Sequence, residues 1–488
     1  MEPSIKALLE DRVFYFFSQI SDIPRESGNE KAISDYLKNF AQERGLFVRQ
    51  DEYLNILIKK PATPGYEKAP IVILQGHMDM VCEKNAGTVH DFLKDPLKLV
   101  IEGDFLKADG TTLGGDNGIA VAYALALLDA SDLPHPGLEV IVTTDEEVGL
   151  TGALAMDVSD VEGKYFVNLD SEEEGEFVVS CAGGLRAIFK MPLQYQKVER
   201  SAYNQVNLSI KGLKGGHSGV EIDKNRANAN MLTGIVLCKL NDALDDLKVL
   251  TVSGGMKDNV ITREGFSTIL VNKNSMKVYE DALLDVIAEI QYEYKTSDPD
   301  IQITSEVVEC DPSIQVLSKQ SKEDLIFLLM SFPTGIQAMS AEIPGLVESS
   351  INLGKLRIEE DELVFEFATR SSVKSRKQRM VRTLQMFADK VGGTCIETKK
   401  YPEWPFKSQS KLLDQCVATY EKLYGRKPIV KGLHAGLESG VFLEKLPHLE
   451  AISFGPDLFD VHSPDERLSI PSTKRTWEYL TEVLKSLI

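Results

Sequence analysis

The sequence has few cysteines and too few basic residues to balance its acids, and each shortage excludes a class of protein. Its 488 residues include only 6 cysteines, which lie far apart with no Cys-x-x-Cys pair. A disulfide framework is therefore excluded, and free thiols in a reducing compartment are expected. The 54 basic residues stand against 74 acidic ones, which gives a net charge of −20. This charge would repel nucleic acid and anionic membranes but suits a protein that binds cations.

The sequence also lacks a long apolar run. The longest wholly apolar stretch, "IAVAYALALL" at 119–128, is about half as long as a membrane-spanning helix requires. The first twenty residues carry acids where a signal peptide needs basic and then apolar residues, so no export signal is expected. These observations predict a soluble, cytoplasmic protein with no membrane partner.

Three common catalytic signatures are missing as well. The sequence contains no G-x-S-x-G nucleophile elbow, no His-Glu-x-x-His pair and no G-x-x-x-x-G-K-[ST] phosphate loop. Serine hydrolases and nucleotide-binding enzymes are normally recognised by such segments. Neither class is supported here.

Short apolar runs in the first third of the chain predict buried strands. At 43% hydrophobic residues, a chain of this length has material for more than one core, so two domains are expected. A helical segment is predicted over 117–128, between two of the apolar runs. Apolar strands that alternate with helices indicate an α/β sheet covered on both faces. The predicted strands span 71–74, 138–142, 165–167 and, much later, 451–454.

The pattern changes at about residue 187. Segments such as "NQVNLSIKG" and "ELVFEFATR" alternate apolar and polar residues, and long helices are predicted to follow them over 226–247 and 374–390. Alternation of this kind indicates strands with one covered face, an α+β layer. The strand, helix, strand pattern occurs twice, which predicts two related halves. The predicted domains are a first part of an α/β domain at 1–186, an inserted domain at 187–400, and the second part of the α/β domain at 401–488.

Histidine and carboxylate side chains follow the predicted α/β strands. Ligands of open α/β sheets bind beyond the carboxyl ends of the strands, so we expect these side chains to meet. A mixed nitrogen and oxygen donor set suits zinc or a similar divalent ion. Singly, each segment has an ordinary alternative as a surface turn, a solvated loop or a helix cap, and it is their joint appearance that favours a metal site. The residues are His77, Asp79, Asp116, Glu146, Glu147, Asp170 and His462.

Five segments, in this order, resemble the motifs of the dizinc exopeptidases of the aminoacylase and carboxypeptidase type. Within that family the chain is most similar to the bacterial aminoacyl-histidine dipeptidases, which cut Xaa-His dipeptides such as β-Ala-His. The resemblance implies a catalytic domain interrupted by a lid domain, two divalent metal ions, and a homodimer. Zinc is the expected metal, with cobalt or manganese as alternatives. The segments are "GHMDMV", "GGDNGIAVA", "TTDEEVGLTGA", "NLDSEEEGE" and "GPDLFDVHSPDE".

The resemblance also implies a role for each residue of the metal site. His77 and Asp170 would bind one metal, Glu147 and His462 the other, and Asp116 would bridge both. Asp79 would orient the imidazole of His77 without touching a metal. Glu146 would be the general base that takes a proton from a water activated between the two ions.

Four further residues are expected to contact the substrate. His217 in "KGGHSGV" would stabilise the oxyanion, Asn259 and Arg370 would hold the polar ends of the substrate, and His434 in "GLHAGLESG" would lie near the pocket. The lid that carries the first three is expected to close over the metals. The local sequence alone is equally consistent with ordinary turn or surface positions for His217, Asn259 and Arg370. The acidic run 172–174 is interpreted as a solvated turn.

The implied function is metal-dependent hydrolysis of dipeptides, with a small peptide as the substrate and no nucleic-acid partner. An N-acyl amino acid deacylase or a carboxypeptidase of the same family is the first alternative. A non-catalytic binding module that keeps the fold is the second. Because loss of function would delete ligands or the base, the complete set of these residues argues against the module.

Overall fold

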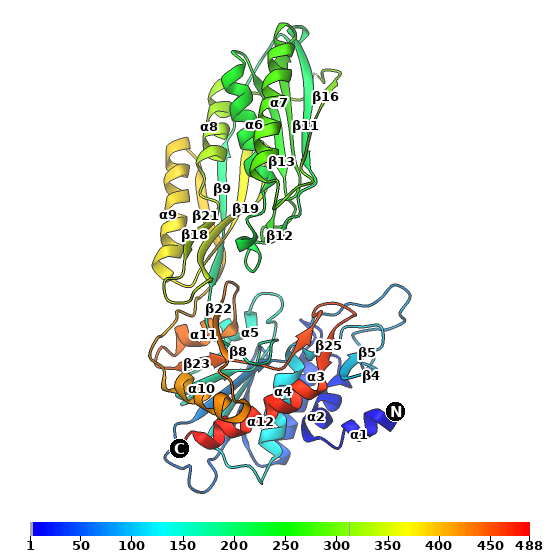
Figure 1. Ribbon diagram of the computed structural model, residues 1–488, viewed down its shortest axis with the longest axis vertical. Coiled ribbons are helices and arrows are strands. Elements are labelled where there is room, and N and C mark those ends of the chain that lie inside the picture. Colours follow the sequence, from blue (N-terminus) through cyan, green and yellow to red (C-terminus); the bar gives the residue numbers. More distant parts are fainter. Residues whose placement is uncertain (1–2, 312) are drawn as a thin grey trace. The chain divides into compact units, whose positions relative to one another are not determined.

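The protein, described here by a computed structural model of residues 3–311 and 313–488, divides into two units. Figure 1 shows that the blue N-terminal part and the red C-terminal part of the chain belong to the same unit. Unit 1 comprises Met1–Cys181, Trp404–Gly432 and Leu437–Ile488. Unit 2 comprises Ala182–Glu403 and Leu433–Gly436.

The short segment Leu433–Gly436 was predicted to lie in the α/β domain, but it packs with unit 2. The main-chain N–H of Ala182 donates to the oxygens of Leu433 at 3.0 Å and Ala435 at 3.1 Å. These bonds place His434 among the residues of unit 2. Sequence patterns did not reveal this excursion because four residues carry no periodicity of their own.

An eight-stranded sheet forms the middle of unit 1. Strand β3 is parallel to its neighbours β6 and β7, and β23 continues parallel beside β7. The carboxyl ends of these four strands therefore lie at one edge of the sheet, where ligands bind in α/β folds. In spatial order the strands are β1 (Phe47–Gln50), β2 (Ile56–Lys60), β6 (Leu138–Thr143), β3 (Val72–His77), β7 (Tyr165–Asn168), β23 (Glu450–Ser453), β8 (Glu176–Cys181) and β22 (Ile429–Leu433).

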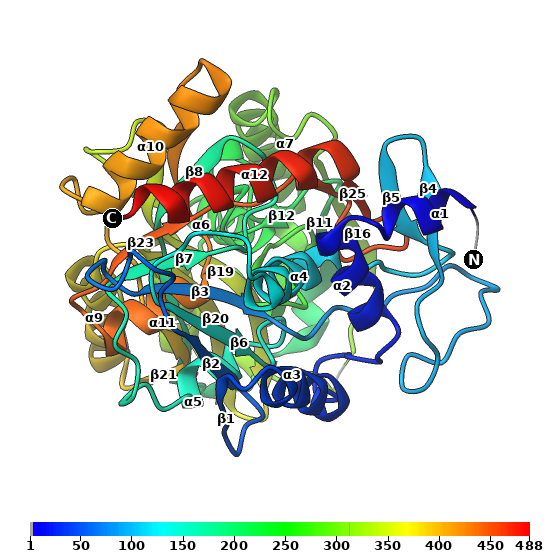
Figure 2. The ribbon, with the colours of Figure 1, turned by 90° about the horizontal axis from the view of Figure 1, so that it is seen from below.

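Helices pack on both faces of this sheet, as the sequence predicted. Val72 and Leu74 of β3 join one core with helix α4, whereas Phe166 of β7 faces Phe442 of α11 with ring centroids 5.4 Å apart. Figure 2 shows the adjacent helices α10 and α12. The helices of unit 1 are α1 (Pro3–Leu8), α2 (Arg12–Ser21), α3 (Lys31–Glu43), α4 (Gly115–Asp129), α5 (Thr151–Ala155), α10 (Lys411–Tyr424), α11 (Glu438–Lys445) and α12 (Ile470–Ser486).

A four-stranded antiparallel sheet completes unit 1. It joins segments from the first and last quarters of the chain, because β25 pairs with β5. Its strands are β24 (Leu458–Phe459), β25 (Arg467–Ser469), β5 (Phe105–Ala108) and β4 (Leu99–Glu102).

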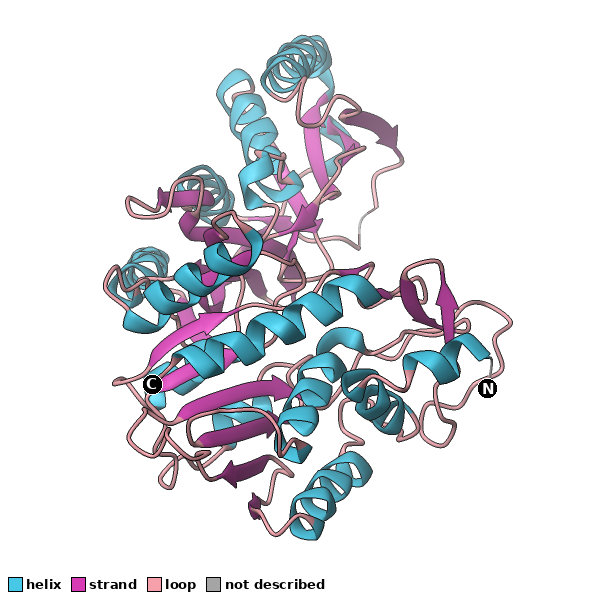
Figure 3. Ribbon diagram, turned by 60° about the horizontal axis from the view of Figure 1, so that its bottom comes forward, coloured by secondary structure: helices cyan, strands magenta, loops and turns pink. Residues whose placement is uncertain are grey.

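Unit 2 is an antiparallel sheet with helices and its own core, the predicted α+β layer. Figure 1 labels helices α6 (Ala229–Ala243), α7 (Met276–Glu293), α8 (Lys319–Ser331) and α9 (Lys374–Val391) beside its strands. Figure 3 shows the helices of the protein in cyan and its strands in magenta. In spatial order the strands are β16 (Gln302–Val308), β11 (Tyr203–Lys211), β15 (Gly265–Asn272), β13 (Lys248–Gly254), β19 (Val347–Glu359), β20 (Glu362–Ser371), β9 (Gly183–Pro192) and β21 (Thr394–Tyr401), with β18 (Gly335–Met339) paired to β19.

Helix α6 is shorter than the predicted helix over 226–247. Asn228 caps its start, because the side-chain oxygen accepts the N–H of Asn230 at 3.0 Å. The helix ends before Leu244, whose backbone is extended. Unit 2 also contains the short strand pairs β12 (Gly216–His217) with β14 (Val260–Ile261), and β10 (Tyr195–Gln196) with β17 (Val316–Leu317). No helix within residues 3–311 and 313–488 is long and apolar enough to cross a membrane.

Candidate metal centre

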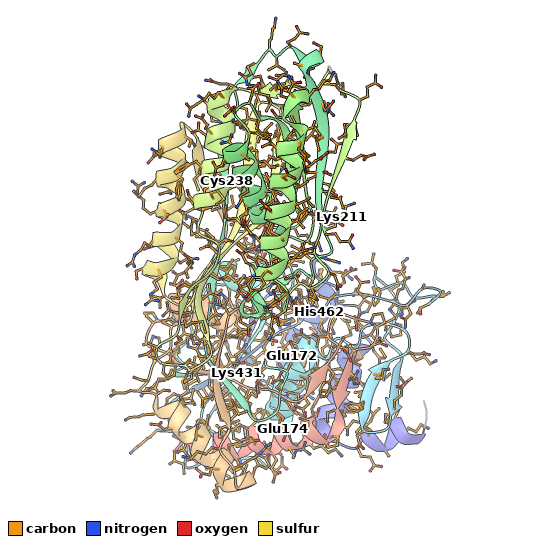
Figure 4. The ribbon with its side chains drawn as sticks, turned by 45° about the horizontal axis from the view of Figure 1, so that its top comes forward. Glu172, Glu174, Lys211, Cys238, Lys431 and His462 are labelled. Carbon is orange, nitrogen blue, oxygen red and sulfur yellow. The ribbon has the colours of Figure 1, made fainter. Side chains whose placement is uncertain are left out.

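The strand ends of unit 1 deliver histidine and carboxylate side chains to one place. Strand β3 ends at His77, β6 leads into Glu147, and β7 leads into Asp170. Asp116 lies in the first turn of α4. His462, which is labelled in Figure 4, follows strand β24 in a loop.

Asp116 lies between the two histidines. Its Oδ1 is 3.1 Å from His77 Nε2, and its Oδ2 is 3.2 Å from His462 Nε2. His77 Nε2 is also 3.5 Å from Asp170 Oδ1, and His462 Nε2 is 3.0 Å from Glu147 Oε1. The arrangement therefore contains two groups of donors that share the Asp116 carboxylate.

The backbone at two of these residues departs from regular structure. Asp116 has φ −80° and ψ 108° inside the turn that begins α4, and a cis peptide bond joins it to Asn117. His462 has φ +61°, in the left-handed region that a residue with a β-carbon seldom adopts. A left-handed conformation such as that of His462 is found at functional sites, where the surrounding structure holds it.

The electrostatics of the centre favour the binding of a cation. Burial raises the pKa of Asp170 to about 6 and that of Glu146 well above its usual range. Hydrogen bonds to Asp116 and Glu147 raise the pKa of His462 to about 11. Within residues 3–311 and 313–488, no Lys or Arg forms an ion pair with the Asp116, Glu147 or Asp170 carboxylates.

The donor atoms fit divalent metal ions. One group is His77, Asp116 and Asp170, and another is Asp116, Glu147 and His462, with the ligand atoms of each within 4.8 Å of one another. Carboxylate oxygens with one imidazole nitrogen are donors that zinc and similar ions accept. A third group, His77 with Glu146 and Glu147, meets the same distance limit and is the alternative arrangement.

Asp79 is fully buried and connects two of the ligand segments. Its Oδ1 lies 3.3 Å from His77 Nδ1, and the main-chain oxygen of Asp79 lies 3.1 Å from the same nitrogen. The carboxylate also accepts the main-chain N–H groups of Glu146 at 3.1 Å and Glu147 at 3.3 Å, and the hydroxyl of Ser27 at 2.8 Å. Asp79 can therefore position both the His77 imidazole and the Glu146–Glu147 turn.

Glu438, in the segment "GLHAGLESG", is a buried acid beside the centre that the sequence analysis did not single out. Its Oε2 accepts Gln75 Nε2 at 2.5 Å and the Thr143 hydroxyl at 2.6 Å, so it joins the ends of β3 and β6. Burial raises the pKa of Glu438 to about 8. Its signal in the sequence is its position four residues after His434, in a segment expected to lie near the pocket.

The predicted solvated turn at 172–174 is wrong for Glu174. Both oxygens of that carboxylate accept hydrogen bonds from Arg475, at 2.7 and 2.6 Å. Glu172 and Glu173 are exposed, in agreement with the prediction, and partial desolvation of its carboxyl raises the pKa of Glu172 to about 7. Figure 4 labels Glu172 and Glu174 in unit 1.

The four residues expected to contact substrate lie in unit 2. His217 Nε2 is 3.2 Å from Arg370 Nη2, and Arg370 Nη1 donates to the Tyr401 hydroxyl at 2.7 Å. His434 Nε2 is 2.7 Å from the Ser350 hydroxyl. Burial, reinforced by Arg370, lowers the pKa of His217 to about 4 and that of His434 to about 3. Both imidazoles are therefore neutral near pH 7.

Arg370 is a buried cation without a carboxylate partner. It is 4% exposed, its Nε has no hydrogen-bond partner, and no acid pairs with it in the described part of the chain. A buried charge of this kind is costly unless an anion joins it. Asn259 lies beside the same cluster, since its main-chain oxygen accepts the N–H of Ser218 at 2.9 Å.

Comparisons with known proteins agree on one family. The model of peptidase family M20/M25/M40 matches residues 73–486. The cytosol non-specific dipeptidase of Escherichia coli K12 is 37% identical over 473 residues, which cover 96% of each chain. The crystal structure of an aminoacylhistidine dipeptidase from Vibrio alginolyticus has a TM-score of 0.93 and 35% identity, and covers 99% of this chain and 98% of that one. An aminopeptidase structure from Bacillus cereus, at 17% identity, TM-score 0.55 and 98% coverage of both chains, shares the fold alone.

The lowered pKa of His434 predicts acid sensitivity. Its imidazole takes a proton at about pH 6.5 in the unfolded chain but at about pH 3 in the folded protein, so the folded state loses stability as pH falls from 6.5. His434→Gln should remove about 1–3 kcal/mol of the stability loss between pH 6.5 and 4.

Urea unfolding of the chelated protein from pH 8 to pH 4 measures this effect, because chelation removes any contribution from metal release. The difference between wild type and variant at pH 8, where His434 is neutral in both states, sets the baseline. Parallel pH curves for the two proteins would contradict the assigned environment of His434.

Proposed function

Because this chain belongs to peptidase family M20/M25/M40, we propose that it is a metallodipeptidase that works at the centre around Asp116. The sharing of Asp116 between His77 and His462 supports this proposal most directly. Two full-length relatives carry dipeptidase names, which makes a dipeptide the substrate rather than a longer chain.

We assign His77 and Asp170 to one metal, Glu147 and His462 to the other, and Asp116 to both. Divalent ions bound there would polarise the scissile carbonyl and acidify the attacking water. Asp79 holds the His77 ring so that Nε2 points at the centre. The shared carboxylate fixes the spacing of the two donor groups.

Glu146 is the general base of the proposal. It accepts the proton of the attacking water and later donates it to the leaving amine. Its position supports the role, since its carboxylate can approach the donors of His77 and Glu147 within 4.8 Å and its main-chain N–H is held by Asp79. Asp79 thereby contributes to catalysis through position alone.

The cluster around Arg370 supplies the anion-binding groups. Because His217 Nδ1 accepts the N–H of Val220 at 3.3 Å, the proton of the neutral ring is assigned to Nε2, which lies 3.2 Å from Arg370 Nη2. Two donors this close favour the binding of negatively charged oxygens beside them. Arg370 binds the dipeptide carboxylate, His217 stabilises the oxyanion, and Asn259 and His434 complete the polar contacts.

The finer features of the proposal follow the family resemblance and the names of the relatives. The substrates are Xaa-His dipeptides, such as β-Ala-His, together with other dipeptides. Zinc is the proposed metal, a homodimer the proposed assembly and the cytoplasm the proposed location. The name of the Escherichia coli relative supports the last of these.

Removing either the metal or the base should stop catalysis. Chelation should abolish dipeptide hydrolysis, and zinc, cobalt or manganese should restore it. Glu146→Gln should keep the metal content of the wild type but lose about 10²–10⁴-fold in kcat, because proton transfer is lost while shape is nearly kept. Glu52→Gln, an exposed acid in the same unit, is the control and should retain full activity. Full activity of the chelated enzyme, or of Glu146→Gln, would overturn the mechanism.

Arg370 should discriminate between dipeptides and dipeptide amides. Arg370→Ala should weaken kcat/KM for dipeptides by about 2–4 kcal/mol, because a charge-paired carboxylate contact is lost. The loss should be much smaller for amides, which lack the carboxylate. Arg382→Ala, an exposed arginine of unit 2, is the matched control. Equal losses on both substrates would show that Arg370 does not bind the carboxylate of the dipeptide.

A further inference from the structure

Glu466 is a buried acid that binds the loop leading into Asp116. It is 2% exposed, and its two oxygens accept four consecutive main-chain N–H groups. Oε2 accepts those of Leu113 at 2.7 Å and Gly114 at 2.9 Å, and Oε1 accepts those of Gly115 at 2.8 Å and Asp116 at 3.3 Å. Buried N–H groups must find acceptors, so this carboxylate determines the path of the loop.

Arg25 binds the carbonyl side of the same loop. Its guanidinium is 2% exposed and donates to the main-chain oxygens of Gly114 at 2.5 Å, Met78 at 3.1 Å and Asp79 at 3.4 Å. It therefore joins the loop before Asp116 to the segment that follows His77. The two ligand-bearing segments are fixed to each other by one side chain.

The glycines of "LGGDNG" make room for this arrangement. A β-carbon at Gly114 would lie 2.4 Å from Arg25 Nη2, and one at Gly118 would lie 2.6 Å from the same atom. Gly114 also has φ +64°, which favours glycine. The glycines therefore leave room for the Arg25 side chain, and Gly114 also allows the turn.

We propose that Arg25 and Glu466 are positioning residues that clamp the Leu113–Asp116 loop and aim the Asp116 carboxylate at both metal positions before a metal binds. Gly114 is held from both sides, by Glu466 at its N–H and by Arg25 at its oxygen. Neither residue contacts a donor atom of the centre in these bonds, so each acts through the loop. The inference rests on the metal centre of the proposed function and adds two residues to it: Arg25, which lies outside the five matched segments, and Glu466, the last residue of "GPDLFDVHSPDE", to which no role was assigned.

The clamp depends on the charge of Glu466. Four N–H groups require a side chain that only accepts hydrogen bonds, which an ionised carboxylate does. In Glu466→Gln the side-chain NH2 group would face two of these N–H groups, and it cannot accept a hydrogen bond from either. The loop would then relax, and Asp116 would no longer bind both metals in one fixed geometry. Residues that orient metal ligands in this way typically change metal affinity by about 10–100-fold when they are replaced.

The test measures metal affinity and loop protection rather than activity alone. Competition with a chromophoric chelator should show that Glu466→Gln binds zinc about 10–100-fold more weakly than wild type. Hydrogen exchange on the metal-free protein should be faster at residues 113–116 in the variant. Asp465→Asn, the exposed neighbour, is the isosteric control and should match wild type in both measurements. Excess zinc should restore much of the lost activity, with KM for the dipeptide unchanged.

Unchanged zinc affinity together with unchanged exchange at 113–116 would overturn the clamp. If Glu466→Gln does not fold, Glu466→Asp replaces it, because it keeps the charge but is too short to bond all four N–H groups. Wild-type zinc affinity in that variant would equally overturn the inference. Exchange in the metal-free protein needs neither substrate nor metal. Failure of the proposed peptidase activity would therefore leave that result intact.

Discussion

The sharing of one carboxylate between two histidines is the constraint on which the rest of the centre depends. Asp116 can face His77 with one oxygen and His462 with the other only if its backbone leaves the helical path and its loop is held rigidly. The carboxylates around it are crowded and partly buried, and no Lys or Arg forms an ion pair with Asp116, Glu147 or Asp170 in the described residues. Divalent cations would favour the ionised carboxylates and so offset the burial that raises the pKa of Asp170 and Glu146.

The fold meets this constraint through parallel strands and buried ionic groups. Three neighbouring strands end at the same edge and lead into His77, Glu147 and Asp170, while Asp79 joins the first two segments through hydrogen bonds. Glu466 and Arg25 hold the loop before Asp116 in the same way, through hydrogen bonds to its main-chain groups. Each buried charge is matched to several main-chain groups, so hydrogen bonds within the protein set the geometry of the proposed ligands.

Much of this could be predicted from the sequence, and the remainder depends on contacts between distant residues. Apolar runs revealed the strands because a sheet covered on both faces leaves a continuous apolar pattern, and position at the strand ends singled out His77 and Asp170. The contacts of Glu466, Arg25 and Tyr401 had no such signal, since a glutamate that bonds four N–H groups looks the same in sequence as a solvated one. The excursion of His434 into unit 2 was likewise invisible, because it depends on main-chain bonds to Ala182.

The central claim is that Asp116 bridges two metal ions, and anomalous scattering tests it most directly. Crystals of the zinc-loaded protein, measured on both sides of the zinc absorption edge, should show two peaks in unit 1. One should lie among His77, Asp116 and Asp170, and the other among Asp116, Glu147 and His462. A single peak held by His77, Glu146 and Glu147 would contradict the account, because it would make the proposed base a ligand and leave Asp116 without its bridging role.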